Sequence, residues 1–494
     1  MTGKGVAVRP RRRVAMLTPL PPTRTGVAHY VSLLLPELSR EVELSAFDSL
    51  DGYRRSDFDT VIYQLGNNPH HEAMYLEAMK EPGIAVLHDL VLHHLIVELT
   101  LARGDATGYI DTLARNHGPA GEAWAQGRAA GMHAELGNFL LPASIEVARR
   151  SIAVIVHNRY AAERLRSFGV TTPIHIVPHP YVHESRHFDR DFIRGRFGFA
   201  PEHRVIGFFG FLTSAKRAGQ VLDAFHAARE LDPRLRLLIV GEPAPDIDLS
   251  RFDREGIVTT GYVDDDEFPS FYAAADRCVN LRYPSAGETS GTLIRAFDAG
   301  LPVAVSDYAQ FAEFPEECVF RVPLDATEKD RLVEFFTGDL RSPSAAQRAW
   351  LDANARVDLT VRGYLQAMRG EATAGEAPSS LAPLPIFPRL ELVGLEVDHE
   401  IRLRIRNSGE TTLRTRTYGQ PEYRMIAKLF VDGVEVGNRW LALPCDLFAG
   451  GETDLAVRLN LPERPFELRL FHALQDVPSV DAEPWLIAEA GGAR

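Results

Sequence analysis

Small residues and one acid precede an expected helix in the stretch RYPSAGETSGTLIRAFDAGLPVAVSD, from Arg282 to Asp307. Apolar residues at helical spacing would give this helix a buried face, and Gly300 with the following proline predicts its end. The segment PVAVS then has the pattern of a buried strand. A loop of Gly, Ser and Thr at a helix N-terminus collects unpaired N–H groups, which is how proteins hold phosphate. An ordinary N-capped helix, with Ser290 or Thr289 as the cap, explains the pattern equally well.

Histidines and acids elsewhere raise the question of a metal site. His88 ends the predicted strand GIAVLHD, and His93 and His94 follow closely. Their spacing does not place three ligands on one helical face, and no cysteine is near. The acids of VDDDEF, residues 263–268, are better explained as N-terminal acids of a helix than as a metal-binding DxD motif. No metal is therefore expected.

The elements that would position these residues alternate strand and helix over the first 370 residues. Predicted strands include RVAML, DTVIYQLG, GIAVLHD and SIAVIVHN, then RVIGFFGF, LRLLIVGE, IVTTGYV, RCVNLRYP and PVAVSD. Strands alternating with helices specify parallel sheets covered on both faces. The fold class is thus α/β, with two Rossmann-like domains over residues 1–195 and 196–370. Ligands in such sheets bind at the carboxyl ends of the strands, where the candidate residues lie.

The pattern changes towards the C-terminus. The stretch RAWLDANARVDLTVRGYLQAM predicts one helix ending near Met368, and residues 371–384 have the Ala, Pro, Ser and Gly content of a linker. Residues 385–494 then alternate apolar and polar residues, with turn signals such as Asp-Gly and Gly-Gly. This pattern predicts an all-β, immunoglobulin-like sandwich.

Composition narrows the class of protein. The 494 residues carry a net charge of −13, which argues against broad nucleic-acid binding. The three cysteines, Cys278, Cys318 and Cys445, form no CxxC and suggest a reducing compartment. No apolar run predicts a signal peptide or a transmembrane helix, so a cytoplasmic protein is expected. The basic RPRRR at residues 9–13 is explained as a solvated lead-in to the first strand, with contact to an anionic membrane face as the alternative.

Several motifs together resemble retaining glycosyltransferases of family 4. The segments GETSG and GLPV resemble the family's donor loop, and GFLTSAKRAG its "GRL…KG" pattern. LTPLPPTRTGVAHY resembles the "SPLPP…SGIADY" opening of one branch, YQLGNNPHH its "GN" loop and GIAVLHD its "VLHD". The resemblance covers about residues 13–368 and implies a GT-B fold, in which two Rossmann-like domains face each other. The C-terminal sandwich faintly resembles modules attached to cell-surface polysaccharide enzymes.

The resemblance implies roles for individual residues. His88 would contact the donor sugar where the acceptor meets it, Glu288 would contact hydroxyls of that sugar, and Lys216 would neutralise the diphosphate. The expected donor-binding residues are Gly26, Gly210, Arg217, Tyr262, Val263, Ser290, Gly291, Thr292 and Arg295. Asn67, Asn68 and Asp89 would lie on the acceptor side. Turn-forming roles explain Gly26 and the two asparagines as well, and helix capping is the alternative for His88.

The sequence departs from the family pattern at two points. The second acid of the donor helix falls on Arg295 or Ala296, and the arginine that accompanies the family's lysine falls on Phe211. Arg217 or Arg282 would then have to supply the missing positive charge.

The expected function is transfer of a sugar, mannose by family habit, from a nucleotide-diphosphate sugar to a saccharide or lipid-linked acceptor. The resemblance implies retention of anomeric configuration, no cofactor and a place in surface polysaccharide synthesis. A non-catalytic GT-B protein that binds a glycan or a partner enzyme is the alternative, and a sugar-nucleotide epimerase is a third and less favoured one.

Overall fold

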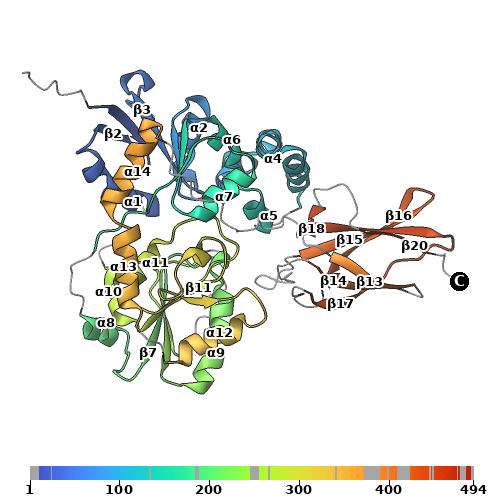
Figure 1. The fold of residues 1–494 in the computed structure, drawn as a ribbon. Helices are drawn as coiled ribbons and strands as arrows, with labels where there is room; N and C mark the ends of the chain where they lie inside the picture. Colours follow the sequence, from blue (N-terminus) through green and yellow to red (C-terminus); the bar gives the residue numbers. More distant parts are fainter. Residues whose placement is uncertain are drawn as a thin grey trace, which may run out of the picture.

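The computed structural model describes most of the chain (Figure 1). The described residues are 11–23, 25–132, 135–183, 189–244, 247, 255–264, 267–339, 342–371, 390–397, 400–408, 423–443, 447, 450–474, 477–478 and 486–490. Residues 372–389, which include most of the expected linker, lie outside them, as do Cys445 and two acids of VDDDEF, Asp265 and Asp266.

The first domain is a six-stranded parallel sheet in the order β2-β1-β3-β4-β5-β6. Its elements are β1 (Arg13–Leu17), α1 (Gly26–Leu38), β2 (Glu43–Phe47), β3 (Thr60–Leu65), α2 (Glu72–Lys80), β4 (Ile84–Leu87), α3 (His93–Leu99), α4 (Ala106–Ala129), α5 (Glu135–Leu140), α6 (Ile145–Arg150), β5 (Ala153–Val156), α7 (Arg159–Ser167) and β6 (Ile174–Ile176). Strand β2 was not predicted, because ELSAF is only half-buried at the sheet edge and lacks a continuous apolar run.

The second domain repeats the design, with strands in the order β12-β11-β10-β7-β8-β9, all parallel. Its elements are α8 (Arg190–Arg196), β7 (Arg204–Phe209), α9 (Ala218–Leu231), β8 (Leu235–Val240), β9 (Ile257–Thr259), α10 (Phe268–Ala274), β10 (Arg277–Asn280), α11 (Gly291–Asp298), β11 (Val303–Ser306), β12 (Phe320–Val322), α12 (Glu328–Thr337) and α13 (Ser344–Asn354). Strand order reverses between β7 and β10, which is where ligands bind in open sheets of this kind.

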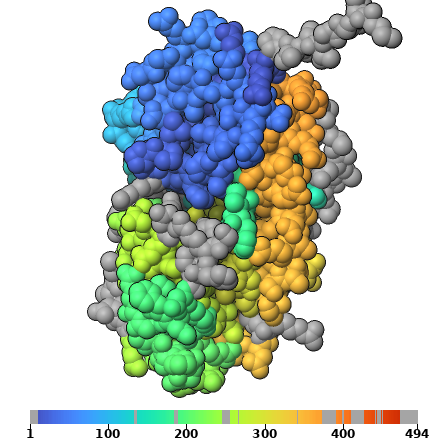
Figure 2. All heavy atoms as spheres, turned by 90° about the vertical axis from the view of Figure 1, so that its left-hand side faces the viewer, coloured from blue at the N-terminus to red at the C-terminus, as the bar shows by residue number. Residues whose placement is uncertain are grey.

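The single helix expected before Met368 is two helices. Helix α13 ends at Asn354, and α14 (Val357–Arg369) begins after a short break. At the break the Ala355 carbonyl accepts a hydrogen bond from the Tyr181 amide at 2.7 Å, which ties the segment to the chain crossing between the domains. Beyond it, α14 packs its apolar face on the first sheet, while α13 stays with the second (Figure 1). Figure 2 shows the segment that contains α13 and α14, in orange, running along both parallel-sheet domains.

The C-terminal region is the all-β module that the sequence predicts. Its strands are β13 (Leu390–Val397), β14 (Ile401–Asn407), β15 (Tyr423–Val431), β16 (Val434–Ala442), β17 (Glu452–Val457), β18 (Phe466–Leu474), β19 (Val477–Pro478) and β20 (Leu486–Ala490). They form one sheet in the order β13-β14-β17 and another in the order β16-β15-β18-β19, with β20 also beside β18. Asp432 and Gly433 both have positive φ, as the predicted hairpin turn between β15 and β16 requires.

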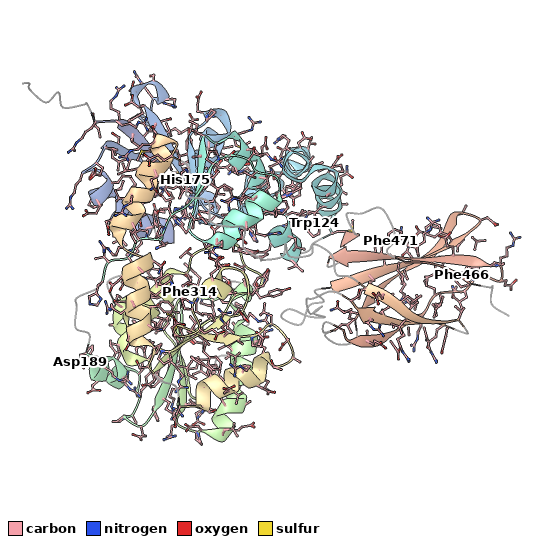
Figure 3. All side chains as sticks on the ribbon, in the orientation of Figure 1. Trp124, His175, Asp189, Phe314, Phe466 and Phe471 are labelled. Atoms are coloured by element: carbon pink, nitrogen blue, oxygen red, sulfur yellow. The ribbon has the colours of Figure 1, made fainter. Side chains whose placement is uncertain are left out.

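Apolar layers cover both faces of each parallel sheet, and a separate cluster lies between the two sheets of the sandwich. Trp124 of α4 is buried in the helical layer of the first domain, Phe314 lies in the second, and Phe466 and Phe471 lie in the sandwich (Figure 3). Among the described residues, no helix is long and apolar enough to cross a membrane.

Candidate functional site between the two parallel sheets

A cavity of about 690 Å³ lies between the two Rossmann-like domains. Its walls are formed by segments that follow the carboxyl ends of strands in both sheets, together with the start of α1. The predicted residues that line it are Gly26, Asn67, Asn68, His88, Asp89, Gly210, Lys216, Tyr262, Val263, Glu288, Ser290, Gly291, Thr292 and Arg295. The fold therefore brings nearly all of the sequence-predicted residues to one place.

Helix α11 begins with a capping residue, as predicted from the sequence. Ser290 is the N-cap of α11, and its hydroxyl accepts a hydrogen bond from the Leu293 amide at 3.3 Å. The Ser290 and Thr292 hydroxyls also donate to the Asn280 side chain at 3.1 and 3.0 Å, which fixes the first turn against the end of β10. The backbone N–H groups of Gly291 and Thr292 have no acceptor within the described part of the chain. Two unpaired amides at the positive end of a helix can therefore receive an anion from the cavity.

Lys216 reaches the same part of the cavity from the 3₁₀ turn η4 (Ser214–Lys216). Its ammonium donates to the Phe209 carbonyl at 2.7 Å, at the end of β7. Burial, aided by the nearby Arg282, holds the pKa of this amine well below its ordinary value. The backbone at position 210 favours glycine, because its φ is +81° and a Cβ there would lie 2.7 Å from the Lys216 nitrogen.

Arg217 does not line the cavity. Its guanidinium is buried and forms a two-pronged ion pair with Glu328 at the start of α12, next to the Tyr283 ring. This pair ties the start of α9 to α12 within the second domain. The sequence prediction of a donor-binding Arg217 is therefore corrected, because the side chain is committed to a neighbouring helix.

Of the two arginines expected to supply the missing positive charge, Arg282 is the one that lines the cavity. It follows β10 and its Nε donates to the Glu288 carboxylate at 2.8 Å, with both side chains mostly buried. The second Glu288 oxygen accepts from the Ser285 hydroxyl at 3.3 Å, and the Gln310 amide donates to the Glu288 carbonyl at 2.8 Å. Glu288 is thus held at the cavity wall by Arg282 and Ser285 through its carboxylate and by Gln310 through its carbonyl.

Arg295 is the residue that faces the cavity at the position of the family's second acid, since Ala296 is buried in the core. Its guanidinium lies over the Phe268 ring, 5.2 Å from the ring centre, and 3.4 Å from the His29 ring nitrogen of α1. A positive side chain therefore spans the space between the two domains at this point.

Two exposed aromatic residues stand at the cavity wall formed by the second domain. Phe211 is 54% exposed and Tyr262 is 40% exposed, and both line the cavity beside Val263. Gly241 lies between them in the chain, and its backbone passes so close to Gly210 that a Cβ would be 2.4 Å from the Gly210 carbonyl oxygen. The side chains of Phe211, Tyr262 and Val263 give this wall of the cavity an apolar surface.

His88 occupies the opposite wall, in the first domain. Its Nε2 lies 2.7 Å from the Gln64 side-chain oxygen, so it does not cap the following helix. The Tyr30 ring packs edge-on against it, with ring centres 4.6 Å apart. Burial and the neighbouring His157 hold the pKa of His88 well below its ordinary value, so the imidazole is neutral.

Asp89, Asn67 and Asn68, for which the sequence predicts an acceptor-side role, lie together on the cavity wall of the first domain. Asp89 accepts a hydrogen bond from the Asn67 amide at 2.8 Å, and burial together with Glu288 raises its pKa to about 7. The Asn67 side chain accepts from the His94 and Leu95 amides at 2.9 and 3.2 Å, and Asn68 accepts from the His70 amide at 3.1 Å. Both asparagine side chains therefore have the structural role that the sequence left open as an alternative.

The three histidines considered as metal ligands turn to different partners. The two ring nitrogens of His93 contact the Leu141 carbonyl and the Tyr109 hydroxyl, both at 2.6 Å, and His94 lies against Asn67. His88 faces Gln64 instead.

Sequence reasoning missed several cavity residues. His157 and His179 follow β5 and β6, and Glu242 follows β8, so each lies at the carboxyl end of a predicted strand. Burial lowers the pKa of His157 to about 4 and that of His179 to about 3. Their position after a strand was the available signal. His29 lies on a helix surface and had no such signal.

The match to a known protein family falls within the second domain. Residues 203–329 match the family described as Glycosyl transferases group 1. Mannosylfructose-phosphate synthase from Agrobacterium fabrum is 31% identical over an alignment of 152 residues, and the match covers 27% of this chain. The chain spans about a third, 32%, of the length of that relative.

Solved structures extend the similarity to both Rossmann-like domains. Sucrose-phosphate synthase from Thermosynechococcus elongatus superposes with a TM-score of 0.51 at 15% identity, covering 73% of this chain and 99% of that one. Anabaena HepE in complex with UDP and glucose gives a TM-score of 0.50 at 14% identity, over 72% of this chain and 100% of that one. The two facing domains of this chain have the GT-B fold.

Proposed function

We propose that this chain is a glycosyltransferase that moves a sugar from a nucleotide-diphosphate donor to a saccharide or lipid-linked acceptor with retention of configuration. The observation that carries the proposal is the convergence of the open amides at Gly291 and Thr292 with Lys216 and Arg282 on one wall of the cavity. These groups suit a diphosphate, and His88 on the opposite wall suits a sugar between the domains.

The chemistry follows from where charge develops. As the bond between the anomeric carbon and the diphosphate oxygen breaks, the sugar becomes oxocarbenium-like and negative charge grows on the diphosphate. Preorganised amides and the Lys216 ammonium stabilise that charge most in the transition state. The acceptor hydroxyl attacks the same face of the sugar and gives its proton to the departing phosphate oxygen, so no protein nucleophile is required.

The finer assignments draw on the relatives. HepE is described in complex with UDP and glucose, and the name of the Agrobacterium relative refers to a mannosyl product, so UDP and GDP sugars are the first donors to test. Mannose as the transferred sugar, independence from metal and a role in surface polysaccharide synthesis at the inner face of the membrane belong to the same proposal.

Calorimetry and turnover test the proposal together. UDP, GDP, ADP and dTDP are titrated into the full chain, and release of free nucleotide diphosphate from the matching sugars is measured with and without EDTA. We expect one nucleotide to bind, and turnover that EDTA leaves unchanged. Failure of all four nucleotides to bind a well-folded sample contradicts the proposal. Binding without turnover across a donor and acceptor panel favours a non-catalytic glycan-binding or scaffold protein.

A further inference from the structure

A polar side chain lies in the middle of the first sheet, directly behind the candidate site. Gln64 belongs to β3, where it follows Val61, Ile62 and Tyr63, and it is fully buried. A buried amide that lacks hydrogen bonds destabilises the folded state, so the partners of this amide contribute to the stability of the fold. They come from three separate elements: the end of β4, helix α14 and strand β1.

The partners fix which way the amide points. The Gln64 nitrogen lies 3.0 Å from the Tyr364 hydroxyl of α14 and 3.5 Å from the Met16 sulfur of β1. Thioether sulfur only accepts hydrogen bonds, so the NH₂ group belongs on that side. The Gln64 oxygen then faces the His88 Nε2 atom at 2.7 Å.

This orientation decides the protonation of the imidazole. An amide oxygen accepts and never donates, so the His88 Nε2 atom must carry the hydrogen. A neutral ring protonated at Nε2 has a bare lone pair on Nδ1. That atom has no partner in the described part of the chain, and His88 lines the cavity.

Helix α14 completes the network. The Tyr364 hydroxyl lies 2.9 Å from the Tyr30 hydroxyl of α1, and the Tyr30 ring is the one that packs against His88. Tyr30, Gln64 and Tyr364 are all fully buried, so the chain of hydrogen bonds is shielded from water. Helix α14, which follows the second domain in the chain, lies beside the first domain (Figure 1). Its Tyr364 is thereby linked to the His88 imidazole through Gln64.

We propose that Gln64 and Tyr364 are positioning residues that hold His88 in the tautomer protonated at Nε2, so that Nδ1 accepts a hydrogen bond from a sugar hydroxyl in the cavity. This inference rests on the proposed function for the identity of the ligand. It makes His88 an acceptor towards substrate and gives α14 a role in the site that it does not contact.

The tautomer can be read without any substrate. In the full chain labelled with ¹⁵N-histidine, two-bond ¹H–¹⁵N correlations distinguish a ring protonated at Nε2 from one protonated at Nδ1 and from the imidazolium. The His88 signals are identified by their loss in His88→Asn. We expect the Nε2–H form in the wild type and a mixture in Tyr364→Phe, where the Gln64 nitrogen loses its 3.0 Å oxygen partner and keeps only the longer contact to the Met16 sulfur. Gln64→Leu should also give a mixture, and Tyr364→Phe decides the question if that variant does not fold.

Tyr63→Phe is a matched control. Tyr63 precedes Gln64 on β3, is equally buried, and its hydroxyl donates to the Glu81 carbonyl at 2.9 Å. The variant loses one buried hydrogen bond without touching the network, so His88 should stay in the Nε2–H form. In turnover assays we expect Tyr364→Phe to lower kcat about tenfold with the donor KM within about twofold, and Tyr63→Phe to change neither.

The two proposals fail in different ways. A wild-type His88 that is protonated at Nδ1, or doubly protonated, overturns the positioning role, as does an unchanged tautomer together with unchanged kcat in Tyr364→Phe. A chain that shows the expected tautomers but transfers no sugar overturns the proposed function instead.

Discussion

At the scale of single residues, the site contains buried titratable groups whose pKa values are shifted. Lys216 is held in a pocket that disfavours its ammonium form, and Asp89 in one that disfavours its carboxylate form. Both pKa shifts arise mainly from burial, and each predicts how the protein responds to pH.

Removal of the Lys216 ammonium should weaken the site most where charge develops. We expect Lys216→Ala to lower kcat by roughly a hundredfold, since one preorganised donor contributes about 3 kcal/mol to such a transition state. A diphosphate bound beside Lys216 raises its lowered pKa, so binding takes up a proton and weakens as pH rises. Calorimetry in buffers of different ionisation enthalpy measures this uptake in the wild type, and it should disappear in the variant. Equal proton uptake by both proteins would contradict the assignment.

Asp89 predicts a pH dependence of stability. Its pKa is about 7 in the folded chain against an ordinary value near 3.8, so the folded state holds a proton that the unfolded state releases. The stabilisation from this group is complete below the ordinary value and is lost as pH rises through 7. We therefore expect Asp89→Asn to raise Tm relative to the wild type at about pH 8 and much less at about pH 5. The same difference in Tm at both pH values would show that the carboxyl is not shifted.

At the scale of elements, the backbone conformation favours glycine at position 210 but tolerates other residues at position 291. Gly210 has positive φ and sits against Lys216, whereas Gly291 has open space around its Cα at the start of α11. We expect Gly210→Ala to lower the free energy of unfolding by about 1–2 kcal/mol and to weaken nucleotide binding. Gly291→Ala, as the control, should fold at least as stably, because alanine suits a helix better. Thermal unfolding of the two variants checks this, and an equally stable Gly210→Ala would refute it.

The helices and strands also show which parts of the fold could be predicted from the sequence. The apolar strands were predicted with their starts within two residues, although the strands predicted for β9 and β10 ran four residues too far. Ser290 was one of the two caps predicted for α11. Buried parallel strands and capped helices have strong local signals. The break between α13 and α14 was missed, since it is fixed by the distant Tyr181 backbone rather than by a local proline or glycine. For the same reason Arg217 was misplaced: its partner Glu328 lies more than a hundred residues away.

At the scale of the whole molecule, the two domains are joined by direct polar contacts beside the cavity. The Val91 amide donates to the Ala286 carbonyl at 3.0 Å, and the Asn158 side chain donates to the Gly287 carbonyl at 2.8 Å. The donor loop is therefore held by the first domain as well as by its own. This arrangement makes the geometry of the site depend on how the domains meet.

Glu313 offers a way to test that dependence from outside the cavity. It ends the 3₁₀ segment η6 (Ala309–Glu313) of the second domain, and its carboxylate accepts from the Arg159 and Tyr160 amides at the start of α7, at 3.0 and 2.6 Å. Glu313→Ala leaves these amides without their acceptor at the positive end of the helix, which costs about 1 kcal/mol or more of interdomain contact. Glu334→Ala is the control, because Glu334 is half-exposed and its ion pair is with Arg331 of the same helix.

The expected result separates binding from turnover. In the proposed function the nucleotide binds mainly to the second domain, so the affinity measured by calorimetry should change little in Glu313→Ala. The kcat should fall several-fold, because His88 and the loop before α11 no longer keep their relative positions. Small-angle scattering should show a larger radius of gyration for Glu313→Ala than for Glu334→Ala. If both variants match the wild type in kcat and in radius of gyration, the contact of Glu313 with α7 does not determine the relative position of the domains. The contact of Asn158 with the Gly287 carbonyl would then be the next one to test.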